Sequence, residues 1–474
     1  MLPCRSRAWP VRSAPGETLP AAAPMFRKLL IANRGEPVVR IARAAQALGI
    51  QAVGVVSEAD ANASWVKCLD EVVPIGGRAP GESYLQMETL VQAALQTGCA
   101  AVHPAWGFLA ENPRFAALCA QHGLTFIGPT PGVMQRMALK WPAKSSMDAA
   151  GLTCIPGSKG LLSGPEQAAV IAAETGYPVI VKADAGGGGR GIRKVDKPED
   201  LAAAFAAASA ESLAAFGNGA LYLERYLTGG RHIEFQLITD RFGNAVHLFE
   251  RDCSVQRNHQ KLIEESPSPA IDEETRQRVG KQVAEAAASI GYTGAGTIEF
   301  LRRPDTGELC FMEMNTRLQV EHCVSEMVTG IDIVAEQIKV AANEALSFRQ
   351  EDLSLTGHAI EVRLNAEDPS ANFQPTPGTL TRFSIPTDQG PGTIRIDTHL
   401  SEGDEISPYY DSLIGKVIAH APTREEAIET LVRTLQAAQI EGVKTTLPLH
   451  LAVLQSPEFK SGDYDTSCIP GWPA

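Results

Sequence analysis

The stretch Leu29-Leu30-Ile31-Ala32-Asn33-Arg34-Gly35-Glu36-Pro37 predicts the architecture of the first part of the chain. Its apolar residues form a short strand, and Gly35 and Pro37 then begin a helix, because proline is favoured in the first helical turn. The apolar positions of this helix follow the helical period: Val38, Ile41, Ala45 and Leu48. The stretch therefore predicts a strand followed directly by an amphipathic helix.

Further apolar strands are predicted at residues 52–56, 72–75, 100–103 and 124–127. Strands that alternate with helices in this way indicate a doubly wound parallel sheet over roughly residues 25–135. The turn after the first strand lacks the pattern G-x-G-x-x-G, so a dinucleotide site is not supported.

Composition limits the classes of protein and partner. The 474 residues carry a net charge of −13, with 44% hydrophobic and 20% charged residues, as in folded globular proteins. A negative balance argues against nucleic acid or an anionic membrane as a partner. The longest stretch without charged residues, 89–110, contains Gln92, Gly98 and Pro104, so we expect helix, turn and strand there rather than a membrane span.

Cysteine usage and the ends of the chain give further expectations. The nine cysteines include no C-x-x-C pair, which favours reduced thiols and a cytoplasmic location. Residues 1–24 hold three arginines and five prolines without an apolar core, so we predict a disordered leader, with a weak transit peptide as the alternative. Residues 467–474 are expected to be a tail.

Three domains are predicted, at residues 25–135, 136–355 and 356–466, in a mixture of α/β and α+β classes. The second begins with helical sequence and then turns to hairpins. The third is strand-rich, with turn clusters at 375–378 and 401–404 and a closing helix over 423–438.

A glycine run at residues 186–191 lies between two predicted strands, 178–182 and 191–195. A Walker A loop leads from a strand into a helix, so this run is a different device. We interpret it as a glycine flap whose backbone N–H groups close over phosphate, with Lys182 and Arg190 supplying positive charge. The alternative is a flexible surface hairpin.

Residues 297–301 and 310–315 flank a turn and predict a second hairpin. If it is symmetric about Thr306, Glu299 faces Glu313, and Thr297 and Asn315 share that face. The opposite face is expected to enter a core through Ile298, Phe300, Met312 and Met314. Two opposed carboxylates need a cation between them, and oxygen ligands favour magnesium over zinc. The alternative is a solvated face with a slipped register.

Polar residues alternate in two further places. Arg317, Gln319 and Glu321 combine a cation, an amide and a carboxylate that could hold a small planar anion and deprotonate it. Glu361, Arg363 and Asn365 form another polar strand face, and residues 256–261 concentrate cationic and amide groups. Together with the flap, these patterns indicate nucleotide-driven ligation of a small acid.

Five motifs closely resemble biotin carboxylase, the ATP-grasp subunit of acetyl-CoA carboxylase and related biotin-dependent carboxylases. They are residues 28–36, the flap with Arg190, residues 250–261, residues 313–322 and residues 408–411. The resemblance extends from Met25 to about Thr466. It implies a pre-ATP-grasp domain, an ATP-grasp domain with a flap subdomain at about 155–226, and a C-terminal biotin carboxylase domain.

The resemblance also implies roles for individual residues. ATP would contact Lys140, Lys182, Gly188, Gly189, Glu224, Arg225, Tyr226, Leu227, His232, Gln256 and His259. Two Mg²⁺ or Mn²⁺ ions would be held by Glu299, Glu313 and Asn315. Bicarbonate would be held by Lys261, Arg317, Gln319 and the Val320 backbone. Glu321 would be the base that deprotonates bicarbonate, and Arg363 would stabilise the biotin enolate, with Trp106 near the biotin pocket.

The implied reaction is carboxylation of biotin through carboxyphosphate. The chain lacks a lysine flanked by methionines, so the biotin carrier protein and the carboxyltransferase are expected to be separate chains, and the family implies a homodimer. Acetyl-CoA and a role in fatty acid biosynthesis are implied, with other acyl-CoA substrates, urea or a 2-oxo acid as alternatives. Another ATP-grasp ligase and a non-catalytic scaffold are the remaining hypotheses.

The chain departs from the family pattern at several positions. Ala138-Leu139-Lys140 stands where Gly-Asp-Lys is usual, and Asp184-Ala185 replaces a serine and a glycine. Asp184 is expected to add negative charge near phosphate, and the altered helix start puts the role of Lys140 in doubt. Trp106 replaces a tyrosine and Cys323 a proline.

Overall fold

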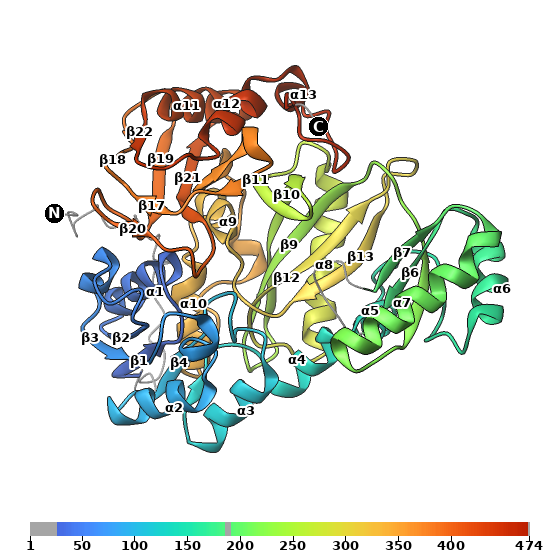
Figure 1. Ribbon diagram of the computed structural model, residues 1–474, viewed down its shortest axis with the longest axis horizontal. Coiled ribbons are helices and arrows are strands. Elements are labelled where there is room, and N and C mark those ends of the chain that lie inside the picture. Colours follow the sequence, from blue (N-terminus) through green and yellow to red (C-terminus); the bar gives the residue numbers. More distant parts are fainter. Residues whose placement is uncertain (1–25, 185–190, 473–474) are drawn as a thin grey trace.

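The computed structural model describes residues 26–184 and 191–472, which fold around three large sheets (Figure 1). Gly188, Gly189 and Arg190, like the predicted leader, lie outside the described residues. Within the described part of the chain, none of the helices combines the length and the apolarity needed to cross a bilayer.

The first sheet is parallel, as the sequence predicts, and its strand order is β3-β2-β1-β4-β5. Its strands are β1 (Lys28–Ile31), β2 (Gln51–Val56), β3 (Glu71–Pro74), β4 (Ala101–His103) and β5 (Thr125–Phe126). The helices α1 (Glu36–Ala47), α2 (Met87–Gln96) and α3 (Pro113–Gln121) connect them. Successive residues of β1 enter two different cores, because side chains alternate between the faces of a strand.

The second sheet has eight antiparallel strands in the order β13-β12-β9-β10-β11-β14-β21-β19. They are β9 (Arg231–Thr239), β10 (Ala245–Arg257), β11 (Gln260–Ser266), β12 (Gly294–Arg302), β13 (Leu309–Asn315), β14 (His358–Asn365), β19 (Thr393–Thr398) and β21 (Leu413–Ala421). This sheet runs across the predicted domain boundary at residue 355. Residues from the second and third predicted domains therefore share one set of backbone hydrogen bonds.

Helices and short strands complete this region. The helices are α4 (Pro131–Ala138), α5 (Lys140–Ala149), α8 (Glu273–Ser289), α9 (His322–Thr329), α10 (Ile333–Ala341), α11 (Arg424–Ala437), α12 (Leu447–Gln455) and α13 (Pro457–Ser461). The short strands pair as β15 (Glu367–Asp368) with β16 (Gln374–Pro375), β17 (Gly378–Thr379) with β20 (Glu405–Ile406), and β18 (Arg382–Ser384) with β22 (Gln439–Glu441). The predicted closing helix is confirmed as α11, which begins with a capping box between Thr423 and Glu426.

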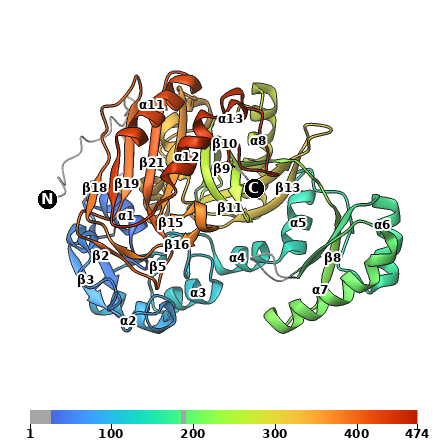
Figure 2. The same cartoon turned by 45° about the horizontal axis from the view of Figure 1, so that its top comes forward.

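The third sheet carries the flap hairpin and lies to one side of the molecule (Figures 1 and 2). It has the order β7-β6-β8, formed by β6 (Val179–Ala183), β7 (Ile192–Val195) and β8 (Leu221–Arg225). The antiparallel pairing of β6 and β7 confirms that the glycine run connects two strands. Helices α6 (Pro165–Thr175) and α7 (Leu201–Phe216) pack on this sheet.

A buried ionic network joins the N-terminal helix α1 to the C-terminal strands. Glu326 on α9 accepts hydrogen bonds from Arg40 (2.7 Å) and Arg395 (2.7 Å). Nearby, the ammonium of Lys416 lies 3.4 Å from Glu36 and donates to the carbonyl of Val320 at 2.9 Å. Burial opposes ionisation of Glu326, but the two arginines hold its pKa at about 2, below the ordinary 4.5.

We expect Glu326→Gln to lower the free energy of unfolding at pH 7 by about 3–5 kcal/mol, because it leaves buried arginines without a full counter-charge. Because folding lowers the pKa of Glu326, its ionisation stabilises the fold fully above pH 4.5, the ordinary pKa in the unfolded chain. This stabilisation is lost as the pH falls toward 2. In urea titrations, the gap in the free energy of unfolding between wild type and the variant should therefore be about 0.8 kcal/mol smaller at pH 4 than at pH 7. Glu285→Gln, which removes an exposed pair with Lys281, is the control, and a pH-independent difference would contradict the prediction.

Candidate functional site

Two carboxylates face each other on the hairpin of β12 and β13. Glu299 is paired with Glu313, and Thr297 with Asn315, which confirms the predicted register over these residues. All four side chains thus belong to one face of the hairpin. The alternative of a slipped register is wrong here.

The register does not stay symmetric beyond this pair. A β-bulge follows Glu299, so that Phe300 pairs with Phe311 instead of Met312. Met312 is 40% exposed, and the prediction that it points into the core is wrong. The other residues predicted for this core are buried: Ile298, Phe300 and Met314.

The two opposed carboxylates have different surroundings. Glu299 is buried and receives a hydrogen bond from Asn315 (2.8 Å) and an ion-pair contact from His232 (3.0 Å). The side chain of Glu313 is 48% exposed and forms an ion pair with Lys140 at 3.7 Å. One carboxylate is therefore fixed, while the other is open to solvent and to a ligand.

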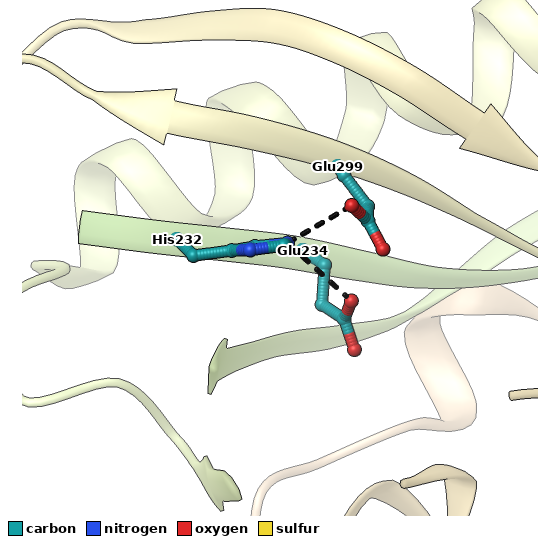
Figure 3. Close-up of side chains that lie close together, drawn as sticks. All are labelled: His232, Glu234 and Glu299. Atoms are coloured by element: carbon teal, nitrogen blue, oxygen red, sulfur yellow. Dashed lines mark ion pairs between the residues drawn. The ribbon is translucent and has the colours of Figure 1, made fainter. Parts of the chain in front are cut away.

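Figure 3 shows His232 and Glu234 from β9 beside Glu299 from β12. Glu234 is fully buried and binds the guanidinium of Arg251 at 2.6 Å. One ligand atom from each of His232, Glu234 and Glu299 lies close enough to the others to hold a metal ion. No sequence motif singled out Glu234, although the alternation of His232, Glu234 and Gln236 along a strand was a usable signal.

Lys261 lies at the centre of this site. Its ammonium donates hydrogen bonds to Glu234 (2.6 Å), Glu299 (2.9 Å), Glu321 (2.6 Å) and Gln319 (3.2 Å). These acceptors come from two strands and from the segment before α9. The side chain predicted to bind bicarbonate is thus the shared partner of three carboxylates.

The charges of this cluster stabilise one another. Burial alone would disfavour every ionised group, but the three carboxylates raise the pKa of Lys261 well above its ordinary value. In the same way, Lys261 holds the pKa of Glu299 and of Glu321 well below the usual range, against the effect of burial. Lys261, Glu299 and Glu321 are therefore ionised at neutral pH.

Glu321 and Arg363 are brought together. The second carboxylate oxygen of Glu321 accepts a hydrogen bond from Nη2 of Arg363 at 3.0 Å. Arg363 also donates through Nε to Glu264 at 2.6 Å, and Glu264 is fully buried on β11. Burial raises the pKa of Glu264 although Arg363 opposes this. Glu264 could not be recognised from the sequence, because it is adjacent to Glu265 in a strand without clear alternation.

Arg317 lies at the edge of the same site. It binds Glu111 (Nε–Oε2 3.0 Å) and donates through Nη2 to the side-chain oxygen of Asn315 at 3.2 Å. Glu111 also accepts the backbone N–H of Thr316 at 2.9 Å. A residue from the N-terminal domain, which no sequence motif singled out, therefore orients the predicted anion-binding arginine.

Trp106 lies close to His322 and Lys416. Its ring lies 6.0 Å from that of His322 and 5.2 Å from the ammonium of Lys416. Its place near the biotin pocket stays a prediction. The ammonium of Lys416 lies over the Trp106 ring and also donates a hydrogen bond to the carbonyl of Val320.

Several residues predicted to contact ATP gather at the third sheet. Lys182 on β6 pairs with Glu224 on β8 at 2.7 Å, and Lys144 binds the other oxygen of Glu224 at 2.6 Å. These two lysines lower the pKa of Glu224 in spite of its burial. Arg225, Tyr226 and Leu227 follow at the end of β8.

Two further residues predicted to contact ATP lie on the hairpin of β10 and β11. Gln256 pairs with Lys261 across the hairpin, and His259 occupies its exposed turn with a positive φ of 65°. The flap residues Gly188 and Gly189 lie outside the described residues.

The described residues can perform two chemical tasks together. Arg317, Lys261 and Gln319 offer donors for a small planar anion, and Glu321 is an ionised carboxylate beside them that can accept a proton. Glu299 and Glu313 offer oxygen atoms suited to a hard divalent cation, which fits magnesium.

We expect Lys261→Met to lower the free energy of unfolding by about 3–5 kcal/mol at pH 8, because it leaves three buried carboxylates without their shared cation. In the variant the pKa values of Glu299 and Glu321 rise, so protonation relieves the repulsion as the pH falls. The difference from wild type should therefore be smaller at pH 6 than at pH 8 in urea titrations. An equal loss at both pH values would contradict this account.

Three family models match most of the chain. The biotin carboxylase N-terminal domain matches residues 25–134, the ATP-binding domain of the carbamoyl-phosphate synthase L chain matches residues 140–349, and the biotin carboxylase C-terminal domain matches residues 361–471.

Individual proteins match over nearly the whole chain. Biotin carboxylase from Nostoc sp. is 48% identical over 94% of this chain and 98% of its own length. A pyruvate carboxylase subunit from Methanothermobacter thermautotrophicus is 46% identical over 94% of this chain and 90% of its own length. The solved biotin carboxylase domain dimer of Hydrogenobacter thermophilus 2-oxoglutarate carboxylase, in complex with MgADP, ADP and bicarbonate, has a TM-score of 0.88 at 47% identity and covers 94% of this chain and 97% of its own.

Proposed function

Because this chain belongs to the biotin carboxylase family, we propose that it carboxylates biotin on a separate carrier protein, using ATP and bicarbonate. It is an ATP-dependent ligase. The observation that best supports the proposed reaction is the position of Glu321, which is buried and ionised between Lys261 and Arg363. A carboxylate in this position can act as a base only toward a small ligand that enters between the two cations.

The first step deprotonates bicarbonate. Arg317, Gln319 and Lys261 hold the anion, and Glu321 accepts its proton. The resulting oxygen attacks the γ-phosphorus of ATP, and ADP leaves. Holding both anions in one pocket supplies the orientation that this step requires.

The residues that bind ATP carry positive charge toward its phosphates. Lys140 and Lys182, together with the glycine flap, are proposed to contact the phosphates, and residues 224–227 the adenine. Glu299, Glu313 and Asn315 would hold magnesium or manganese, which neutralises phosphate charge when bound. Glu313 is the more open of the two carboxylates and would complete the site once the nucleotide is present.

The second step transfers CO₂ to biotin. Carboxyphosphate, the product of the first step, breaks down to CO₂ and phosphate. The released phosphate takes up the proton of a ureido N–H of biotin, and that nitrogen then bonds to the CO₂. Arg363 is proposed to stabilise the negative charge on the ureido oxygen. Its guanidinium is already oriented by Glu264 and Glu321, so little reorganisation is needed.

We further propose that the chain works as a homodimer with a biotin carrier protein and a carboxyltransferase that acts on acetyl-CoA or another acyl-CoA, in the cytoplasm. Relatives named biotin carboxylase support the carrier protein, and the solved dimer of a biotin carboxylase domain supports the homodimer. Relatives named for pyruvate and 2-oxoglutarate carboxylases make 2-oxo acids the competing acceptors. Copurification of the carboxyltransferase and assay with acetyl-CoA, pyruvate and 2-oxoglutarate would discriminate between them.

The purified chain should cleave ATP in a reaction that requires bicarbonate and is stimulated by free biotin. Arg317→Ala should reduce this rate by about a hundredfold, since a charged anion-binding group is lost. Release of ADP measured with and without bicarbonate and biotin tests both statements. ATP cleavage that is indifferent to both would refute the proposed function.

Glu321→Gln should reduce bicarbonate-dependent ADP release by about 10²–10⁴-fold, the usual contribution of a positioned base. The dissociation constant of MgATP should stay within about twofold, because Glu321 faces the bicarbonate pocket. Calorimetry measures the dissociation constant of MgATP, and Glu285→Gln is a surface control. A variant that retains most of its activity would remove Glu321 from the role of base.

A further inference from the structure

The helix α5 begins without a cap from its own sequence. Its N-cap residue is Leu139, whose side chain makes no capping hydrogen bond. In the first turn, Pro142 has no N–H, and the N–H of Ala143 bonds the carbonyl of Leu139 at 3.0 Å. The N–H groups of Lys140 and Trp141 therefore need acceptors from elsewhere.

Asp184, at the end of β6, supplies both acceptors. Its backbone carbonyl accepts from Lys140 at 3.1 Å, and its side-chain oxygen Oδ1 accepts from Trp141 at 2.8 Å. Asp184 is 4% exposed, and its own N–H is held by the carbonyl of Ala220 at 3.0 Å. The carboxylate that was expected to add negative charge near phosphate is thus engaged in capping a helix.

The same contact fixes a functional side chain. Lys140 is the first residue of α5, and its ammonium lies beside Glu313. Asp184 also lies two residues after Lys182, so one residue connects the elements that carry both lysines. The two hydrogen bonds of Asp184 thus place the start of α5 next to the end of β6.

We propose that Asp184 is a positioning residue for Lys140: it caps α5 from outside the helix and so holds the Lys140 ammonium at the phosphate site. This inference rests on the proposed binding of ATP. Two of the departures from the family pattern then compensate for each other. The capping carboxylate that Leu139 cannot provide comes from Asp184.

The two interpretations of Asp184 predict effects of opposite sign. A free carboxylate near phosphate would repel ATP, so its removal would tighten binding. A capping carboxylate holds Lys140 in place, so its removal weakens binding. The direction of the change in ATP affinity therefore discriminates between them.

We expect Asp184→Ala to raise the dissociation constant of MgATP about fivefold, the effect of losing one helix cap at a binding group. The KM for bicarbonate should stay within about twofold, because the cap contacts no residue of that pocket. In the double variant Leu139→Asp/Asp184→Ala the carboxylate moves to the N-cap position, and the MgATP affinity should return to within about twofold of wild type. Calorimetry and ADP release provide the two readouts.

Asp272→Ala is the matched control, because it removes a carboxylate cap from α8, where Asp272 accepts the N–H of Thr275 at 2.8 Å. It should lose stability without a change in MgATP affinity.

Unchanged or tighter MgATP binding by folded Asp184→Ala overturns the proposal. If that variant does not fold, the double variant decides: weak binding in a folded double variant overturns the proposal, and normal binding supports it. Wild type that binds MgATP but shows no bicarbonate-dependent cleavage would instead refute the proposed function.

Discussion

The buried ammonium of Lys261 is the constraint on which the site depends. Three carboxylates from β9, β12 and the segment before α9 meet around it at 2.6–2.9 Å. Without a cation at this point, burial would force some of them to take up protons. With it, Glu321 remains ionised in a dry environment, which is what a base for a weakly acidic anion requires. The charge of Lys261 therefore serves both the stability of the fold and the ionisation of Glu321, and a substitution of Lys261 changes both.

Much of the fold could be predicted from the sequence, because its signals are local. Apolar runs and helix starts in the first part of the chain predict the parallel sheet, and the polar alternation around Glu299 predicts its pairing with Glu313. The bulge at Met312 could not be predicted, since one extra residue in a strand leaves no mark in composition or period. For a similar reason, the single sheet that spans the predicted boundary at residue 355 depends on long-range pairing of β11 with β14.

The candidate site could be predicted only for residues that lie in motifs. Lys261, Arg317, Glu321 and Arg363 stand in such motifs, and the structure places them around one another. Their partners Glu111, Glu234 and Glu264 stand in no motif. Their role is visible only in the structure, where each carboxylate binds an arginine. The role of Asp184 was equally invisible in the sequence. Its carboxylate suggests repulsion of phosphate, but in the structure it accepts a backbone N–H at the start of α5.

The ion pair between Glu36 and Lys416 has a consequence for the order in which the protein can mature. Glu36 is buried in the N-terminal domain, and its ion-pair partner in the described structure is supplied from β21, near the other end of the chain. During synthesis the N-terminal domain leaves the ribosome long before that partner exists. Until then it must either keep α1 open to water or hold Glu36 protonated, as its raised pKa permits. The N-terminal sheet domain thus receives the counter-charge of Glu36 from a strand that is made later.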